Sequence, residues 1–384
     1  MSEWKEIFID SACSRLSSGK SISSSLIKDK GDYPVYGGNG IRGFTNTYNF
    51  DGECAIIGRQ GASCGNVRYF SGKAYMTEHA VVAVPTKEHN AYYLSCVLAS
   101  LKLGRLSGQS AQPGIGVGLI GKQNIIMPSL ATQQKIASIL SSLDAKIENN
   151  RKICANLEAQ AQALFKHWFI DFAPFKDGKF VESELGMIPE GWRVGAAMDF
   201  FNINIGKTPP RQEPIWFSKN QNDVKWISIS DLGKSGIFIM DSSEKLTKEA
   251  IKKHHIIVVP KNTILLSFKL TIGRVAICNS EMTTNEAIAR FYLNDKSEME
   301  YLYMYLKNYK YELLGSTSSI ATAVNSKIIK KMCILKPPFE VIKKFHSVVN
   351  PLFERIRANI EENDRLSTLR DTLLPKLMSG EIKV

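Results

Sequence analysis

Two long stretches with a heptad pattern constrain what this chain can fold into. From Thr132 to Asp171 there is no glycine and no proline, and apolar side chains alternate at spacings of three and four residues. Such a pattern, kept up over several heptads, indicates a long helix that packs knobs-into-holes against another helix. At 1.5 Å per residue this helix would be about 60 Å long, which is more than a compact domain needs. It therefore requires a partner helix.

The partner is a second copy of the stretch, found near the end of the same chain. Both copies interrupt the apolar seam with an asparagine. The predicted seam consists of Ile136, Leu140, Leu143, Ile147, Asn150, Leu157 and Leu164 in the first helix and Val349, Leu352, Ile356, Asn359, Leu366 and Leu373 in the second. A buried polar residue weakens a coiled coil but penalises wrong registers, so the repeated asparagine suggests register control. The alternative is that both asparagines lie off the seam, in water.

Composition sets the class of protein. A length of 384 residues predicts two or three domains, and an apolar fraction of 44% is enough to bury cores. There is no long apolar run and no signal-like start, so we expect a cytoplasmic protein with no membrane partner. Seven cysteines without a Cys-x-x-Cys pair favour reduced thiols over disulfides or a zinc site. A formal charge of +12 suggests a polyanionic partner.

A globular segment precedes each predicted helix. The expected order is a first domain at 1–128, a helix at 129–172, a linker at 173–190, a second domain at 191–336, and a second helix with its tail at 337–384, the helix itself over Phe339–Met378. In the first domain, glycine-rich turns separate short strand-like runs, and a helix is expected over Ala91–Leu101. The strand-like runs are Tyr33–Tyr36, Cys54–Gly58, Val67–Phe70, Ala80–Val84 and Asn124–Met127.

The second domain repeats the layout of the first. Trp192 matches Trp4, Gly206-Lys207-Thr208 matches Gly19-Lys20-Ser21, and Thr284–Ala287 matches Thr77–Ala80. The second domain is longer, and we place its extra residues at 211–223. The sequence thus predicts an α+β fold in which two similar mixed α/β domains alternate with two long helices. The helices would pair as an antiparallel coiled coil, giving a pseudo-two-fold tandem repeat.

Several strings in this order resemble the specificity (S) subunit of type I restriction–modification systems. In the second half they are Val224–Leu232 and Pro260–Phe268 followed by Ile272–Val275; in the first half, Tyr33–Gly40 and Gly61–Gly65; at the end, Leu374–Ile382. The resemblance implies that the two domains are target-recognition domains, each reading half of an interrupted sequence in duplex DNA. The long helices would hold two modification subunits, and restriction subunits would complete the complex. Those partners would carry the chemistry with S-adenosylmethionine, ATP and Mg²⁺, and this chain would bind no cofactor or metal and have no catalytic residue.

Motifs that would indicate an enzyme do not hold up. Two glycine motifs, beginning at Gly38 and Gly116, lack the strand-then-helix context of a dinucleotide site and are interpreted as loops. Gly206-Lys207-Thr208 lacks the first glycine of a phosphate-binding loop, since position 201 is phenylalanine. Lys336-Pro337-Pro338-Phe339 resembles the loop of adenine methyltransferases, but lysine cannot accept a hydrogen bond from the base. Two alternatives stay open: a self-contained adenine methyltransferase or restriction–methylation enzyme, and an adaptor whose coil only joins proteins.

Polar residues in the glycine-rich loops are the candidates for DNA contact. Arginine can pair with guanine, and glutamine with adenine, along the major groove, whereas many contacts only hold phosphates. The candidates are Lys20, Arg42, Arg59, Gln60, Arg105, Gln109 and Gln112 in the first domain and Lys207, Arg211, Gln212, Lys269, Arg274, Thr317 and Ser318 in the second.

Overall fold

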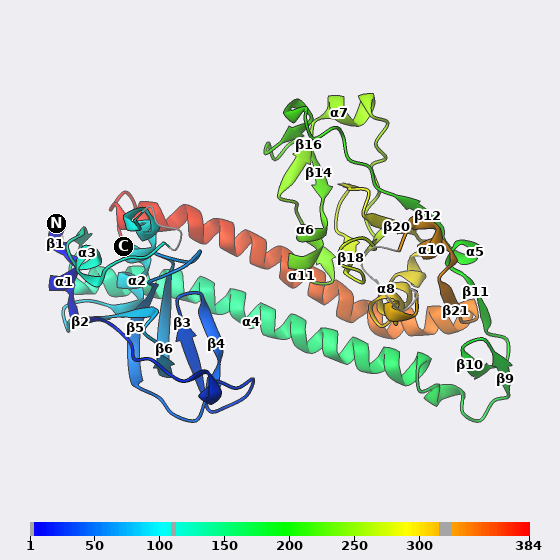
Figure 1. Ribbon diagram of the computed structural model, residues 1–384, viewed down its shortest axis with the longest axis horizontal. Coiled ribbons are helices and arrows are strands. Elements are labelled where there is room, and N and C mark those ends of the chain that lie inside the picture. Colours follow the sequence, from blue (N-terminus) through cyan, green and yellow to red (C-terminus); the bar gives the residue numbers. More distant parts are fainter. Residues whose placement is uncertain (1–3, 109–112, 315–323) are drawn as a thin grey trace. The chain divides into compact units, whose positions relative to one another are not determined.

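The computed structural model describes residues 4–108, 113–314 and 324–384. The chain divides into two compact units, Met1–Asn150 with Glu361–Val384, and Arg151–Ile360. Each unit contains one globular part, called here the first head (up to residue 128) and the second head (191–336), and one half of each long helix (Figure 1). The helices are therefore shared between the units instead of forming separate domains. No helix in the described part of the chain is long and apolar enough to cross a membrane.

The first head is built on a six-stranded sheet with the order β2-β7-β5-β6-β3-β4, beside a separate antiparallel pair of β1 and β8. The strands are β1 (Lys5–Phe8), β2 (Cys13–Ser18), β3 (Tyr33–Gly37), β4 (Gly40–Thr45), β5 (Phe50–Gly58), β6 (Val67–Met76), β7 (Ala80–Pro85) and β8 (Asn124–Met127). The helices are α1 (Ile9–Ala12), α2 (Ala91–Ser100) and α3 (Val117–Gly121), with 3-10 turns η1 (Ser24–Leu26) and η2 (Leu103–Leu106). The second glycine motif of the sequence thus forms α3 and is not only a loop.

The second head contains a five-stranded sheet, β12-β20-β17-β18-β15, a four-stranded sheet, β13-β16-β14-β19, and the pair β11–β21. The strands are β11 (Arg193–Ala196), β12 (Asn202–Ile205), β13 (Phe217–Ser218), β14 (Val224–Ile227), β15 (Phe238–Ile239), β16 (Glu244–Leu246), β17 (Ile264–Ser267), β18 (Val275–Cys278), β19 (Thr283–Thr284), β20 (Ile288–Tyr292) and β21 (Cys333–Lys336). The helices and turns are α5 (Ala197–Phe200), η4 (Pro214–Trp216), α6 (Ile229–Lys234), α7 (Lys248–Lys253), η5 (Lys296–Glu298), α8 (Met299–Lys307), η6 (Tyr311–Leu314) and α10 (Ser326–Lys331).

The two heads share one topology, so the predicted tandem repeat is confirmed. The strand order β2-β7-β5-β6 of the first head recurs as β12-β20-β17-β18 in the second, and the pair β1–β8 recurs as β11–β21. In both heads a helix (α2 or α8) follows this sheet, and the last strand leads directly into a long helix. The repeat therefore extends from single strands to the connection between head and helix.

The extra residues of the second head do not lie where the sequence placed them. The segment before β14 is only slightly longer than the segment before its counterpart β3, whereas the segment from β14 to β17 is much longer than that from β3 to β5. It holds α6, β15, β16 and α7, of which β16 pairs with β14 and α7 follows β16 (Figure 1). The prediction that the extra residues lie at 211–223 was wrong. The sequence alone does not show which strand of the second head corresponds to β3, because the hydrogen bonds between strands identify it.

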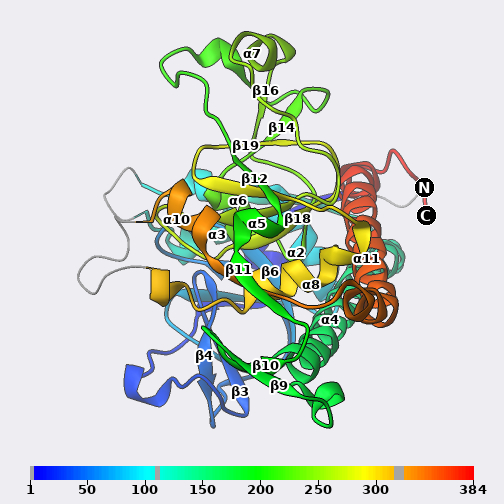
Figure 2. The same ribbon diagram turned by 90° about the vertical axis from the view of Figure 1, so that its right-hand side faces the viewer.

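The predicted linker is an ordered hairpin. Residues Phe180–Ser183 form β9 and Gly186–Pro189 form β10, paired antiparallel, after a short turn η3 (Ala173–Phe175) (Figure 2). The rings of Phe172 and Phe175 pack on Trp192, with centroids 5.4 and 5.2 Å away. Aromatic packing thus ties this segment to the base of the second head.

The long helices are α4 (Leu130–Phe169) and α11 (Phe339–Met378). The start of α4 is capped by Ser129, whose Oγ accepts a hydrogen bond from the N–H of Thr132 at 3.4 Å. The helix α11 has the predicted bounds, and α4 ends two residues before the predicted Asp171.

In the first unit the two helices run antiparallel. Asp144 Oδ1 lies 2.7 Å from Arg370 Nη1, and further along α4 the Asn150 amide donates to Asn363 Oδ1 at 3.0 Å. Asn150 also donates to Glu362 Oε2 at 2.7 Å. As residue numbers rise along α4, those of the partners fall along α11, which is the antiparallel order.

The same order holds in the second unit. Cys154 Sγ lies 3.8 Å from the carbonyl oxygen of Ile356, and further along α4 the ring of Phe165 lies 6.3 Å from that of Phe345. The antiparallel pairing predicted from the heptads is therefore seen in both units.

The seam residues fall into two groups. Ile136, Leu140, Ile147, Asn150, Val349, Ile356 and Asn359 are buried, and Leu143, Leu157, Leu164, Leu352, Leu366 and Leu373 are half-buried. The asparagines thus lie inside the seam, and the alternative that they sit off it in water is wrong.

Each head packs its core onto the helices of its own unit. In the first unit Ile136, Leu140 and Leu377 belong to the same buried cluster as the residues of the head. In the second unit Phe165, Phe345 and the buried part of the head form one cluster. A helix pair alone would leave these side chains in water, so head and helices stabilise each other.

Replacing Asn150 by alanine should destabilise the helix pair. The change removes the hydrogen bonds to Glu362 and Asn363, at a cost of about 1–3 kcal/mol in the free energy of unfolding. Urea denaturation of the whole chain measures it. Asn149→Ala, at the exposed neighbouring position, is the control and should change stability little. Equal effects of the two substitutions would contradict a role of Asn150 in the seam.

Candidate nucleic-acid interface

The first head has a tight glycine–lysine turn where β2 ends. The N–H of Gly19 donates to the carbonyl oxygen of Ala80 at 3.0 Å, and the N–H of Lys20 donates to that of Met76 at 3.0 Å. A Cβ on Gly19 would lie 2.1 Å from the Met76 oxygen, so only glycine fits. The side chain of Lys20 is exposed next to this turn.

The second head repeats the turn with the same bonds. The N–H of Gly206 donates to Ile288 at 3.1 Å and the N–H of Lys207 to Thr284 at 2.9 Å. A Cβ on Gly206 would meet the oxygen of Asn285 at 2.0 Å. The matching Gly-Lys sequences are therefore the same structural feature in both heads.

Hydrogen bonds also correct the alignment of the neighbouring turn. The N–H of Thr77 donates to the Tyr36 oxygen at 2.9 Å, and the N–H of Asn285 donates to the Ile227 oxygen at 3.0 Å. Thr77 thus corresponds to Asn285, one position from the match to Thr284 that the sequence suggested. The match of threonine with threonine shifted the sequence alignment of the two heads by one residue.

Three loops meet beside the turn of the first head. A Cβ on Gly38, between β3 and β4, would lie 3.2 Å from the oxygen of Gln60 and 3.3 Å from that of His79. The N–H of Arg59 donates to the His79 oxygen at 3.0 Å, and its guanidinium lies 3.4 Å from Ser18 Oγ. Arg59 is half-buried and Gln60 is exposed. Packed backbone therefore holds both predicted residues close to the turn of Lys20.

Two further arginines border these loops. The stem of Arg42 lies against Gly37, where a Cβ would be 2.6 Å from Arg42 Cδ. Arg68, on β6, donates to the oxygen of Asn39 at 3.3 Å, and its side chain is exposed. Arg68 was not among the sequence candidates. Nothing in its local pattern shows that the start of β6 lies beside the loop between β3 and β4, where its guanidinium meets Asn39.

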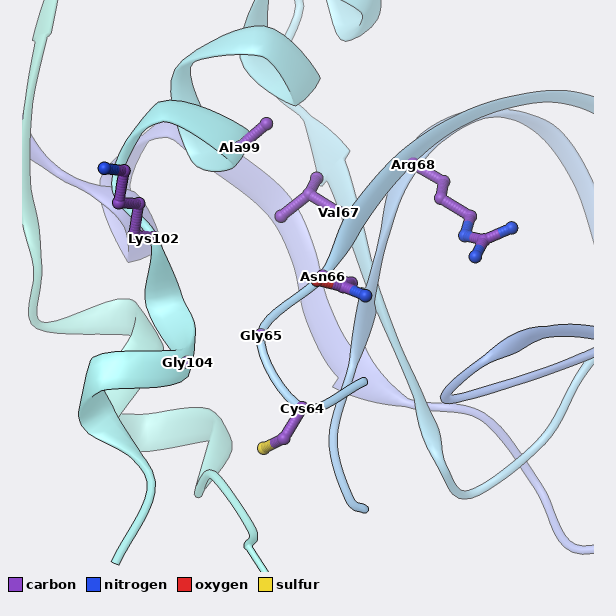
Figure 3. A pocket seen from close by; sticks show the side chains of 8 residues that line it. All are labelled: Cys64, Gly65, Asn66, Val67, Arg68, Ala99, Lys102 and Gly104. Carbon is purple, nitrogen blue, oxygen red and sulfur yellow. The ribbon is translucent and has the colours of Figure 1, made fainter. Parts of the chain in front are cut away.

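An open pocket of about 460 Å³ lies between the loop after β5 and the end of α2. Figure 3 shows Lys102 and Arg68 at opposite sides of it, with Cys64 and Val67 between them. Its lining includes two cations and no acidic residue. Burial raises the pKa of Cys64, so the thiol stays neutral at physiological pH. The guanidinium of Arg68 is directed to Asn39, outside this lining, so its positive charge lies beside the pocket and not inside it.

The loop after β17 in the second head corresponds to the loop after β5. The N–H of Phe268 donates to the oxygen of Ala287 at 3.0 Å, as Arg59 does to His79. The next residue, Lys269, is exposed and corresponds to Gln60. The two heads thus present different side chains on equivalent loops.

The family described as "Type I restriction modification DNA specificity domain" matches residues 1–159 and 189–366. The chain belongs to this family. The family resemblance inferred from sequence is thereby confirmed, and specificity, not self-contained methylation, is the function that the matches support.

Relatives of this specificity chain include the type I restriction enzyme MjaIX specificity subunit of Methanocaldococcus jannaschii, 34% identical, with 77% of this chain and 69% of the relative covered. The HindI specificity subunit of Haemophilus influenzae is 29% identical over 70% of this chain and 71% of the relative. Among solved structures, the S subunit of a type I restriction–modification system from M. genitalium matches with a TM-score of 0.65. It is 18% identical and covers 98% of this chain and 96% of that chain, which shows a shared fold.

Arg211 of the specificity chain has intramolecular partners. Its guanidinium lies 3.0 Å from both carboxylate oxygens of Glu244 and stacks over the rings of Phe217 and Trp226, 4.2 and 4.5 Å from their centroids. This ion pair ties the loop before β14 to β16, and contact of Arg211 with DNA stays a prediction. Gln212, next to it, is exposed.

Arg274 is also used inside the head. Its Nη1 donates to the oxygen of Ile229 at 2.7 Å, at the start of α6, and its guanidinium lies against Gly233. The side chain is half-buried and holds the start of α6, and its contact with DNA stays a prediction. Lys207 is exposed, but its Nζ donates to the oxygen of His254 at 2.6 Å.

Of the remaining candidates, only Arg105 is among the described residues. Arg105 is exposed and donates to Gln123 Oε1 at 3.1 Å. Gln109, Gln112, Thr317 and Ser318 fall outside the described residues. Within the part of the chain that is described, no three His, Cys, Asp or Glu side chains are grouped to hold a metal ion.

Asp231 fixes the start of α6 beneath the second head's loops. Its carboxylate accepts hydrogen bonds from the N–H and Oγ of Ser228, at 2.9 and 2.7 Å, and from those of Ser243, at 3.0 and 2.6 Å. Burial alone would raise the pKa of Asp231, but these hydrogen bonds hold it below its ordinary value. The ionised form is therefore stabilised in the folded protein.

Asp231→Asn should destabilise the second head at neutral pH. The folded-state pKa of Asp231 lies below the unfolded value of about 3.9, so its stabilisation is present above that pH and is lost as the pH falls through the folded pKa. Thermal unfolding from pH 7 to pH 3 should show a gap in Tm between wild type and variant that narrows below about pH 4. Asp177→Asn, at an exposed position, is the control, and a gap independent of pH would contradict this account.

Gly206→Ala should also destabilise the second head, since its Cβ would overlap the oxygen of Asn285. We expect a loss of about 1–3 kcal/mol in the free energy of unfolding, measured by urea denaturation. Gly236→Ala is the matched control because a Cβ there meets nothing within 4 Å. Unchanged stability of Gly206→Ala would show that the turn can open without cost.

Proposed function

We propose that this specificity chain reads an interrupted target in duplex DNA, with one half-site for each head. The main support is that both heads hold a loop on the same backbone turn but present different side chains there. In the first head the half-buried Arg59 is followed by the exposed Gln60, whereas in the second head the buried Phe268 is followed by the exposed Lys269. Arginine and glutamine can pair with the major-groove edges of guanine and adenine. Equivalent loops with unequal side chains suit two different half-sites.

Exposed lysines next to the turns would hold the phosphates. Lys20 and Lys207 are exposed at equivalent positions, and the chain carries a formal charge of +12. Phosphate neutralisation releases counterions and gives binding that weakens steeply with salt. The exposed side chains of Lys102 and Arg68 would provide further cations for phosphate contacts.

We also propose that the long helices hold the partner subunits. Ile139 on α4 and Val348 and Leu369 on α11 are exposed apolar side chains on otherwise polar helix faces. The repeat provides such a helix pair in each unit, which suits two modification subunits. Those subunits and the restriction subunits would carry out the reactions with S-adenosylmethionine, ATP and Mg²⁺ in the cytoplasm. This chain would determine the DNA sequence at which they act.

Mapping of methylated sites in cells that express the chain with its modification subunits tests this proposal. We expect one interrupted motif. Gln60→Ala should relax one position of one half-site and leave the other half-site unchanged, because a bidentate base contact contributes about 1–3 kcal/mol of discrimination.

Gln134→Ala, an exposed glutamine on α4, is the matched control and should leave the whole motif intact. A short continuous palindrome, or a Gln60→Ala motif relaxed in both halves, would contradict one half-site for each head.

A further inference from the structure

A leucine stands at the tip of the loop after β17. Leu270 is 83% exposed, and its backbone φ is +61°. The N–H of Thr271 donates to the oxygen of Lys269 at 2.7 Å, which closes a three-residue turn centred on Leu270. A γ-turn with positive φ is rare and strained, and a branched side chain such as leucine seldom adopts it.

Hydrogen bonds hold this loop in place. Ser267 Oγ donates to the oxygen of Thr271 at 2.6 Å and accepts from the N–H of Arg274 at 3.1 Å. The N–H of Gly273 donates to the oxygen of Ser267 at 3.1 Å. Strained backbone persists where its surroundings fix it and is concentrated at functional sites. The loop therefore presents Leu270 in one defined position.

The fold itself gives no reason for a leucine at this position. Its side chain adds almost nothing to the core, and glycine or asparagine would fit a positive φ with less strain. The loop starts at Phe268, beside Ala287, and Lys269 follows on the surface. Leu270 thus lies on the loop that the proposed function assigns to the second half-site, as an apolar side chain next to a cation.

We propose that Leu270 contacts the methyl group of a thymine in the half-site read by the second head. This inference rests on the proposed function. Along the major groove the bases present hydrogen-bond donors and acceptors, and the C5-methyl of thymine is the apolar group among them. A side chain already held in place loses little freedom on contact, so even one methyl group can be discriminated. Leu270 is therefore a specificity-determining residue.

The test uses the chain assembled with its modification subunits and a duplex that carries the mapped target. Each thymine of the second half-site is replaced in turn by deoxyuridine, which removes only the methyl group. Wild type should bind one of these duplexes about fourfold more weakly, as expected for one buried methyl group. Leu270→Asn, in which asparagine tolerates the positive φ, should bind the thymine and deoxyuridine duplexes equally.

Two variants serve as controls. Leu185→Ala removes another exposed leucine of the same unit, on the β9–β10 hairpin, and should keep the fourfold difference. Lys269→Ala should weaken both duplexes by the same factor, because they differ only in a methyl group, with which a lysine ammonium forms no hydrogen bond. Thermal unfolding of Leu270→Asn should show a head at least as stable as wild type, because the strain at this position is relieved.

The inference is overturned if wild type binds its mapped target but discriminates at no thymine, or if Leu270→Asn keeps the discrimination. It is also overturned if 2-aminopurine in the second half-site becomes brighter with wild type and not with Leu270→Asn, since the side chain would then insert between base pairs. A failure of the proposed function looks different: wild type would prefer no interrupted target at all.

Discussion

Burial of the seam between α4 and α11 is the interaction on which both units depend. A helix of 40 residues with one apolar stripe is marginal in water, and two such helices remove their stripes from water by pairing. The helix pair alone would leave the half-buried leucines and the flanking phenylalanines partly exposed to water. Apolar residues of each head pack on these side chains, and the helices in turn bury apolar residues of the head. Each unit thus has one continuous core that includes parts of both helices.

Duplication has preserved the main-chain arrangement more closely than the side chains. Gly19 and Gly206 make the same pair of hydrogen bonds and exclude a side chain for the same reason. Around them the two heads differ: the second has α7 and a small extra sheet, and its loop exposes Lys269 where the first exposes Gln60. The features that fix the loops are common to both heads, whereas the groups that face outward belong to each head separately. This separation is what two reading heads of unequal specificity require.

The two long helices, α2 and most strands of the first head could be predicted because their signals are local. A heptad pattern and glycine turns are visible within a few residues, and they gave α11 its bounds. The interface was harder, because side-chain roles depend on partners far away in sequence. Arg211 has an ion pair with Glu244, 33 residues later, and Arg68 donates to Asn39, 29 residues earlier, so the surroundings of either arginine cannot be inferred from the local pattern. The position of the extra residues likewise became clear only from hydrogen bonds between strands.

The glycine–lysine turn has a consequence for how such proteins can change. It is held by carbonyl and amide groups, which every residue has, together with one position that must lack a side chain. Substitutions in the loops that pack beside it leave this anchor intact as long as the glycine stays. If the exposed loop residues read DNA as proposed, a few substitutions there would change the preferred sequence while the scaffold stays unaltered.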